Sequence, residues 1–229
     1  MNGKIASIGV IFMSSPTIAR AKTILRAEAT AISAVDLNGA FDAALEALHE
    51  CCGKIITTGM GKAGFVARKF AATLCSTGTA AVYLHPGEAA HGDLGVITRG
   101  DCIVAFSTSG KTREVLELVQ LARRLHCGPV IGVTSHPDSE LRTVSSLVID
   151  MGVVIEPCQF GLTPTASIAV MSSISDALAL VLMEKKQITL QDYGLRHHGG
   201  YLGVKAREGS DETARQPNRQ LFRNGNEQC

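Results

Sequence analysis

The sequence contains no tryptophan, and aromatic residues make up only 4% of its 229 positions. It also lacks an excess of either charge: 22 Lys and Arg stand against 21 Asp and Glu, so nothing favours nucleic acid or an acidic membrane surface as a partner. Its seven cysteines include no C-x-x-C pair, and their odd number makes a reducing compartment the simplest account. We therefore expect a cytoplasmic protein without nucleic-acid partners.

Long apolar runs are missing as well. A membrane-spanning helix requires about 20 consecutive apolar residues. The most apolar stretch, residues 168–183, is interrupted by Ser172, Ser173, Ser175 and Asp176. The sequence therefore predicts no membrane association.

The two ends of the chain differ in composition from its middle. Residues 5–13 form an apolar run after Lys4 and loosely resemble a secretory signal, but a single lysine is a weak charged region and the cysteine usage argues against export. We expect an N-terminal extension at 1–18, one folded domain at 19–206, and a polar, disordered tail at 207–229.

The period of apolar residues changes along the chain. Short apolar runs typical of buried strands alternate with stretches in which apolar residues recur every three or four positions, as in helices. We expect strands at 54–58, 81–84, 102–107, 130–134 and 147–150, and helices at 62–75, 115–126 and 165–185 after two helices within 17–50. This alternation predicts an α/β fold with a mostly parallel sheet covered on both faces.

A hydroxyl-rich loop follows the third expected strand. Residues 106–112 read Phe-Ser-Thr-Ser-Gly-Lys-Thr and precede a helical pattern. Free backbone N–H groups, the positive end of a helix dipole and the hydroxyls of Ser107, Thr108, Ser109 and Thr112 together suit a dianionic phosphate. Ligands of such sheets bind beyond the carboxyl ends of the strands, where this loop lies. We therefore expect a phosphate-bearing ligand here.

Two glycine patterns raise the alternative of a nucleotide ligand. Residues 59–64 fit G-x-G-x-x-G, but no carboxylate ends the following strand, as dinucleotide recognition requires. Residues 109–112 resemble the end of a Walker A loop, but Ala105 occupies the position of its first glycine. Both nucleotide interpretations are therefore disfavoured. The first pattern still allows a ligand to approach the backbone at Gly59 and places Lys62 at the same crevice.

Several residues are candidates for proton transfer. Glu114 lies near the start of the helix after the hydroxyl loop, Glu156 lies in an irregular stretch, and His197 is one of two adjacent histidines before a glycine pair. Either carboxylate could instead cap a helix. A zinc ion would require His85, His91 and His197 to converge, for which the sequence offers no support. We predict no metal and no other cofactor.

These motifs together resemble those of the sugar isomerase (SIS) domain family and, within it, the D-arabinose 5-phosphate isomerases. The resemblance spans about residues 19–205 and is carried by residues 58–62, 75–79, 85–95, 107–110, 161–165 and 197–203. The His-Pro-x-Glu-Ala-x-His-Gly-Asp and Gly-Leu-x-Pro-Thr blocks are specific to the subgroup. Two positions depart from it: many relatives have Ser-His-Pro where this chain has Arg196-His197-His198, and Glu where it has Lys111.

The resemblance implies a three-layer αβα sandwich with a five-stranded parallel sheet, the SIS fold, assembled as a homotetramer whose sites are shared between subunits. It implies interconversion of D-ribulose 5-phosphate and D-arabinose 5-phosphate, which supplies Kdo for lipopolysaccharide. Longer relatives continue into paired CBS domains, so we expect a short, single-domain member. The family's catalytic candidates correspond to Lys62, Glu114, Glu156 and His197, and His91 also lines the site.

The expected chemistry passes through an enediol. Glu156 is our first choice for proton transfer, with Glu114 as its rival, because a carboxylate within reach of the substrate's C–H can serve as the base. His197 would open the sugar ring or move a hydroxyl proton, and Lys62 would stabilise charge on the carbonyl oxygen. An isomerase of another sugar phosphate, or a non-catalytic sugar-phosphate regulator, remains the alternative.

Overall fold

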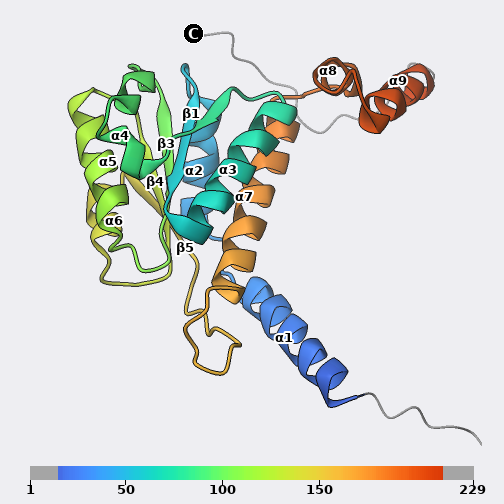
Figure 1. Cartoon of the computed structure of the whole chain (residues 1–229). Coiled ribbons are helices and arrows are strands. Elements are labelled where there is room, and N and C mark those ends of the chain that lie inside the picture. Colours follow the sequence, from blue (N-terminus) through green and yellow to red (C-terminus); the bar gives the residue numbers. More distant parts are fainter. Residues whose placement is uncertain (1–14, 214–229) are drawn as a thin grey trace, which may run out of the picture.

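The computed structural model describes residues 15–213 (Figure 1). Five strands form one parallel sheet in the order β2-β1-β3-β4-β5. They are β1 (Ile55–Gly59), β2 (Ala81–Tyr83), β3 (Cys102–Phe106), β4 (Val130–Thr134) and β5 (Leu147–Asp150). Parallel neighbours need crossover connections, and each one here carries helical segments across a face of the sheet.

Helices cover both faces of the sheet, so the three-layer αβα architecture is confirmed. On one face lie α2 (Gly39–His49), α3 (Gly61–Ser76) and α7 (Ala166–Lys185). On the other lie α4 (Pro86–Ala89), the 3-10 helix η1 (Asp93–Val96), α5 (Arg113–Arg124) and α6 (Glu140–Val144). α1 (Pro16–Ser33) packs against α7, and α8 (Leu190–Arg196) and α9 (Tyr201–Thr213) follow it.

Side chains of the central strand β3 alternate between the two layers. Cys102, Val104 and Phe106 pack with α2, α3 and α7, whereas Ile103 and Ala105 pack with α5. All five are buried. A strand covered on both faces buries every side chain, which explains why the sequence reads here as a continuous apolar run.

Most element boundaries agree with the sequence-based expectations. β4 and β5 begin and end as predicted. Asn38 rather than Asp36 caps α2, because its Oδ1 accepts a hydrogen bond from the Ala40 N–H at 3.0 Å. The sequence did not predict α4, η1, α6, α8 or α9. α9 makes residues 207–213 helical, although we expected them in the polar tail, and residues 1–14 and 214–229 lie outside the described part of the chain.

α7 is the one described helix that is long and apolar enough to cross a bilayer, by length and composition alone, so the expectation that no segment reaches this threshold is wrong. Half of its most apolar window is nevertheless buried inside the fold, where it packs against α1, α2 and α3. Burial of this kind is what a core helix of a sandwich requires.

The carboxyl ends of the five strands lie at one edge of the sheet, at the bottom of Figure 1. The loop of residues 151–165 and α1 lie at this end too. α8 and α9 pack against each other at the opposite end of α7. These two ends separate the residues that the sequence analysis assigned to one site.

Candidate active site

The hydroxyl loop folds into a compact turn after β3. The hydroxyls of Ser107 and Thr112 lie 2.8 Å apart, and the Ser107 Oγ accepts a hydrogen bond from the Gly110 N–H at 3.0 Å. Thr112 is the N-cap of α5, but its side chain makes no capping hydrogen bond with that helix. The first N–H groups of α5 are therefore free of a side-chain cap, as an anion site at a helix N-terminus requires.

The segment after β4 braces this loop from behind. The Leu141 N–H donates to the Gly110 carbonyl at 2.9 Å, and the Ser135 N–H donates to the Thr108 carbonyl at 3.0 Å. Gly110 has a φ of +60°, and a Cβ there would lie 2.3 Å from Ser139. Only glycine satisfies both the backbone angle and the space. The loop is therefore held in a fixed shape before any ligand binds.

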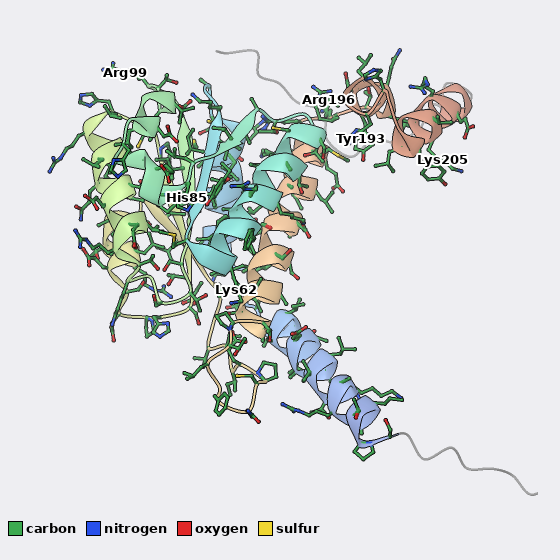
Figure 2. The ribbon with its side chains drawn as sticks, in the orientation of Figure 1. Lys62, His85, Arg99, Tyr193, Arg196 and Lys205 are labelled. Atoms are coloured by element: carbon green, nitrogen blue, oxygen red, sulfur yellow. The ribbon has the colours of Figure 1, made fainter. Side chains whose placement is uncertain are left out.

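The glycine turn after β1 brings α3 close to the strand. A Cβ on Gly64 would lie 2.5 Å from the Gly59 carbonyl oxygen, and the Tyr83 hydroxyl donates to that oxygen at 3.1 Å. Lys62 is exposed in the first turn of α3, at the carboxyl edge of the sheet (Figure 2). No side chain among residues 15–213 forms an ion pair or hydrogen bond with its amine, so the amine is available to a ligand.

Glu156 caps the N-terminus of α7. Its Oε2 accepts the N–H groups of Thr165 and Ala166 at 2.8 Å each, and its Oε1 accepts the N–H and the hydroxyl of Ser167. Partial burial raises the pKa of Glu156, but the bonds from Ser167, Thr165 and Ala166 outweigh it and hold the pKa below its usual value. A carboxylate engaged in this way is a weak base.

Glu114 lies in a different environment. It is exposed in the first turn of α5, two residues after Thr112, and forms no hydrogen bond or ion pair with any residue between 15 and 213. Both of its oxygens are accessible beside the hydroxyl loop. Of the two carboxylates that the sequence left interchangeable, the arrangement favours Glu114 as the base.

His197 lies far from these groups within one chain. It follows α8, its ring stacks on Tyr193 with centroids 4.0 Å apart, and its Nδ1 lies 3.0 Å from the Tyr193 carbonyl oxygen. A carbonyl only accepts, so this contact places a proton on Nδ1 and leaves Nε2 for a ligand. Glu156 lies at the start of α7 and α8 beyond its end, and 20 helical residues span about 30 Å. One chain therefore does not bring His197 to Glu156.

The remaining histidines lie near β2 and α4. His91 is exposed after α4. The Nδ1 of His85 is buried and has no hydrogen-bond partner in the described part of the chain, an arrangement that sequence reasoning passed over, although His85 opens a quoted motif. Within residues 15–213 no three His, Cys, Asp or Glu side chains form a metal-binding group, so His85, His91 and His197 do not converge in one chain.

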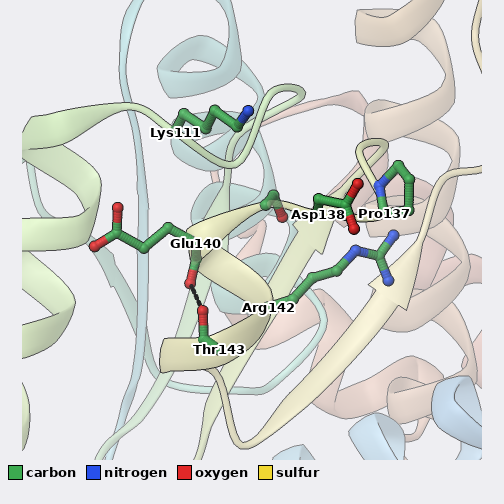
Figure 3. Close-up of a pocket in the computed structure, with 7 residues that line it drawn as sticks. Lys111, Pro137, Asp138, Glu140, Arg142 and Thr143 are labelled. Atoms are coloured by element: carbon green, nitrogen blue, oxygen red, sulfur yellow. Dashed lines mark hydrogen bonds between the residues drawn. The ribbon is translucent and has the colours of Figure 1, made fainter.

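A cavity of about 680 Å³ lies beside the hydroxyl loop, between Lys111 and α6 (Figure 3). Its walls carry charges of both signs, from Asp138 and Glu140 as well as Lys111 and Arg142. The Arg142 guanidinium is already bonded to Asp150 at 2.7 Å. None of the predicted catalytic residues lines this cavity, so it is a neighbour of the candidate site rather than the site itself.

Comparison with known proteins agrees with the fold and the loop. The SIS domain family model matches residues 49–181. The chain belongs to the SIS domain family. This SIS-domain chain is 40% identical over 186 residues to the arabinose 5-phosphate isomerases KdsD of Escherichia coli K12 and Salmonella typhi, a match covering 80% of the chain. The chain spans 56% of the length of these relatives.

Two solved structures are similar over most of the chain. The c3406 protein of E. coli CFT073, solved in complex with a sugar phosphate, is 34% identical with a TM-score of 0.77, and the match covers 81% of this chain and 100% of that one. A candidate phosphosugar isomerase from Bacteroides fragilis is 42% identical with a TM-score of 0.78, covering 81% and 99%.

Proposed function

We propose that this SIS-domain protein is an aldose–ketose isomerase that interconverts D-ribulose 5-phosphate and D-arabinose 5-phosphate. The observation that carries the proposal is its 40% identity, over 80% of the chain, to proteins named arabinose 5-phosphate isomerase. The preformed hydroxyl loop at the carboxyl edge of the sheet supports it. We further propose that the protein acts in the cytoplasm and supplies D-arabinose 5-phosphate for Kdo and lipopolysaccharide.

The phosphate is anchored by the hydroxyl loop and the N-terminus of α5. Ser107, Thr108, Ser109 and Thr112 supply hydroxyls, and the helix supplies N–H groups with positive partial charge. Binding energy from this remote group holds the reacting carbons in place without itself taking part in the reaction. Gly59 allows the ligand to approach the backbone of the neighbouring strand.

The isomerisation moves two protons. From ketose to aldose, a base removes a proton from C1, an enediolate forms, and the proton returns to C2, while the O1 hydroxyl proton moves to O2. We propose Glu114 as the base, in place of Glu156, because its oxygens are accessible and unbonded among the described residues. Lys62 stabilises the negative charge that develops on the carbonyl oxygen. His91 contacts the sugar at the edge of the site.

His197 reaches the site from another subunit of a homotetramer. Apolar side chains are strongly exposed at both ends of the chain's long axis, with exposed fractions between 73% and 90% at the end near Glu156. They are Val153, Ile155, Phe160 and Leu162 at that end, and Leu195, Tyr201 and Leu202 near His197. Exposed apolar surfaces of this kind mark protein interfaces. Packing one end against the other in a neighbouring subunit would cover both and deliver the imidazole.

The direct test is incubation with D-ribulose 5-phosphate followed by specific detection of the aldose. A parallel panel of hexose and heptose phosphates is the control. Formation of D-arabinose 5-phosphate as the fastest reaction supports the proposal. Faster conversion of a longer sugar phosphate would indicate another isomerase, and binding without conversion would indicate a sugar-phosphate regulator.

Mixing two inactive variants tests the shared site. Lys62→Ala and His197→Ala should each abolish turnover alone. If one site uses Lys62 and His197 from different subunits, random mixed tetramers restore intact sites at about a quarter of positions. No recovery on mixing after reversible dissociation would refute the shared arrangement.

A further inference from the structure

Residues 157–164 make few contacts with the rest of the fold. Phe160 and Leu162 are exposed, and the segment lies outside the helices and strands. Among residues 15–213, its hydrogen bonds to another element come from Arg20 alone, whose guanidinium donates to the Pro157 carbonyl at 2.5 Å. Arg20 lies on α1, 137 positions away in sequence. A contact across this distance is not required for helix formation, because α1 has no buried residue at all.

The segment is a small closed unit that hangs from Pro157. The Cys158 Sγ accepts the N–H groups of Leu162 and Thr163 at 3.2 Å each, and the Gly161 N–H donates to the Cys158 carbonyl at 2.9 Å. These bonds close residues 158–163 on themselves. The unit can therefore move as a body unless something outside it fixes one end.

Two anchors on different helices hold the chain around Glu156. The carboxylate of Glu156 is bonded to the N-terminus of α7, and the carbonyl of the next residue, Pro157, is bonded to Arg20 on α1. Because α1 packs against α7, the two anchors belong to one rigid pair of helices. Removing the Arg20 anchor leaves Glu156 held on one side only.

We propose that Arg20 is a positioning residue for the isomerisation, fixing the loop that carries Glu156 through the Pro157 carbonyl. The inference rests on the proposed function for its kinetic consequence only. A displacement of about 1 Å in a catalytic segment can lower a rate up to about a hundredfold, and the exposed hydrogen bond itself contributes little to global stability.

The test compares Arg20→Ala with Arg26→Ala. Arg26 lies on the same helix, is exposed and has no partner in the described part of the chain, so its replacement makes the same change in charge and helix propensity. We expect Arg20→Ala to lower kcat about tenfold with KM within about twofold and an unchanged melting temperature. Arg20→Lys, which keeps a donor, should restore most of the loss, and Arg26→Ala should behave as the unmodified protein.

Amide hydrogen exchange decides the same question without a substrate. In Arg20→Ala the amides of residues 157–164 should exchange faster, whereas in Arg26→Ala they should not. Unchanged exchange in Arg20→Ala, or an equal kcat loss in both variants, overturns the inference. If the unmodified protein fails to isomerise pentose phosphates, the proposed function fails, and the exchange comparison still establishes or refutes the contribution of Arg20 to the loop.

Discussion

Replacing Glu156 with alanine should destabilise the protein more than any catalytic carboxylate normally would. The substitution removes an anionic cap that accepts hydrogen bonds from Thr165, Ala166 and Ser167 at the start of α7. Loss of a side-chain cap costs about 0.5–2 kcal/mol, and loss of a favourable charge at a helix N-terminus adds about 0.3–1 kcal/mol. Since Glu156 is partly exposed, we expect a total of about 2 kcal/mol.

The melting temperature gives a direct measure. For a chain of 150–250 residues, about 1 kcal/mol lowers Tm by about 2–4 °C, so Glu156→Ala should lower it by about 4–8 °C at pH 7. Glu114→Ala is the matched control, because Glu114 is exposed and has no partner among the described residues. Its substitution should change stability by less than about 0.5 kcal/mol.

The pH dependence of this difference tests the cause. Because the folded state holds the pKa of Glu156 below its unfolded value, the carboxylate contributes its full stabilisation above the unfolded pKa. The contribution is lost as pH falls through the folded pKa. The stability gap between the unmodified protein and Glu156→Ala should therefore narrow in acid. Equal melting temperatures for Glu156→Ala and Glu114→Ala, or a gap that ignores pH, would refute the capping role.

Three further outcomes follow from the same structure. Ser109→Ala should raise KM for the sugar phosphate about tenfold without lowering Tm, and an unchanged KM in steady-state assays would mean that the phosphate binds elsewhere. Gly110→Ala should cost about 2–3 kcal/mol in urea unfolding, because it combines a φ of +60° with a 2.3 Å approach to Ser139. Burial raises the pKa of Asp101, but bonds from Lys54 and Thr98 outweigh it and lower the pKa, so stability should be lost as pH falls through the folded pKa, and Asp101→Asn should weaken that acid dependence in urea titrations.

Local sequence signals were sufficient where burial is complete. β4 and β5 were predicted with their observed ends because short apolar runs between turn residues have few other uses in a sheet covered on both faces. α8 and α9 were missed because both are short or polar and bury little within one chain: Leu195 and Tyr201 remain exposed. Their apolar residues carry no periodic signal toward this chain's own core.

Sequence also located the hydroxyl loop but not the state of the carboxylates. Glu114 and Glu156 both matched the family's catalytic positions, and either was consistent with capping a helix. Only the path of residues 151–165 shows that Glu156 turns back onto α7, nine to eleven residues later, while Glu114 remains open to solvent. A side chain's hydrogen-bond partners depend on how an irregular loop folds, and no propensity encodes that path.

The amino-acid sequence by itself determined the α/β layering, the family and the hydroxyl loop, because these depend on local periodicity and on short contiguous motifs. Tertiary structure alone decided which groups share a site. It placed Glu156 in a capping role, linked Arg20 to Pro157 across 137 positions, and set His197 at the far end of α7 from Glu156. Such pairings arise from crossovers and helix packing, which bring distant residues together and separate others that sequence motifs group.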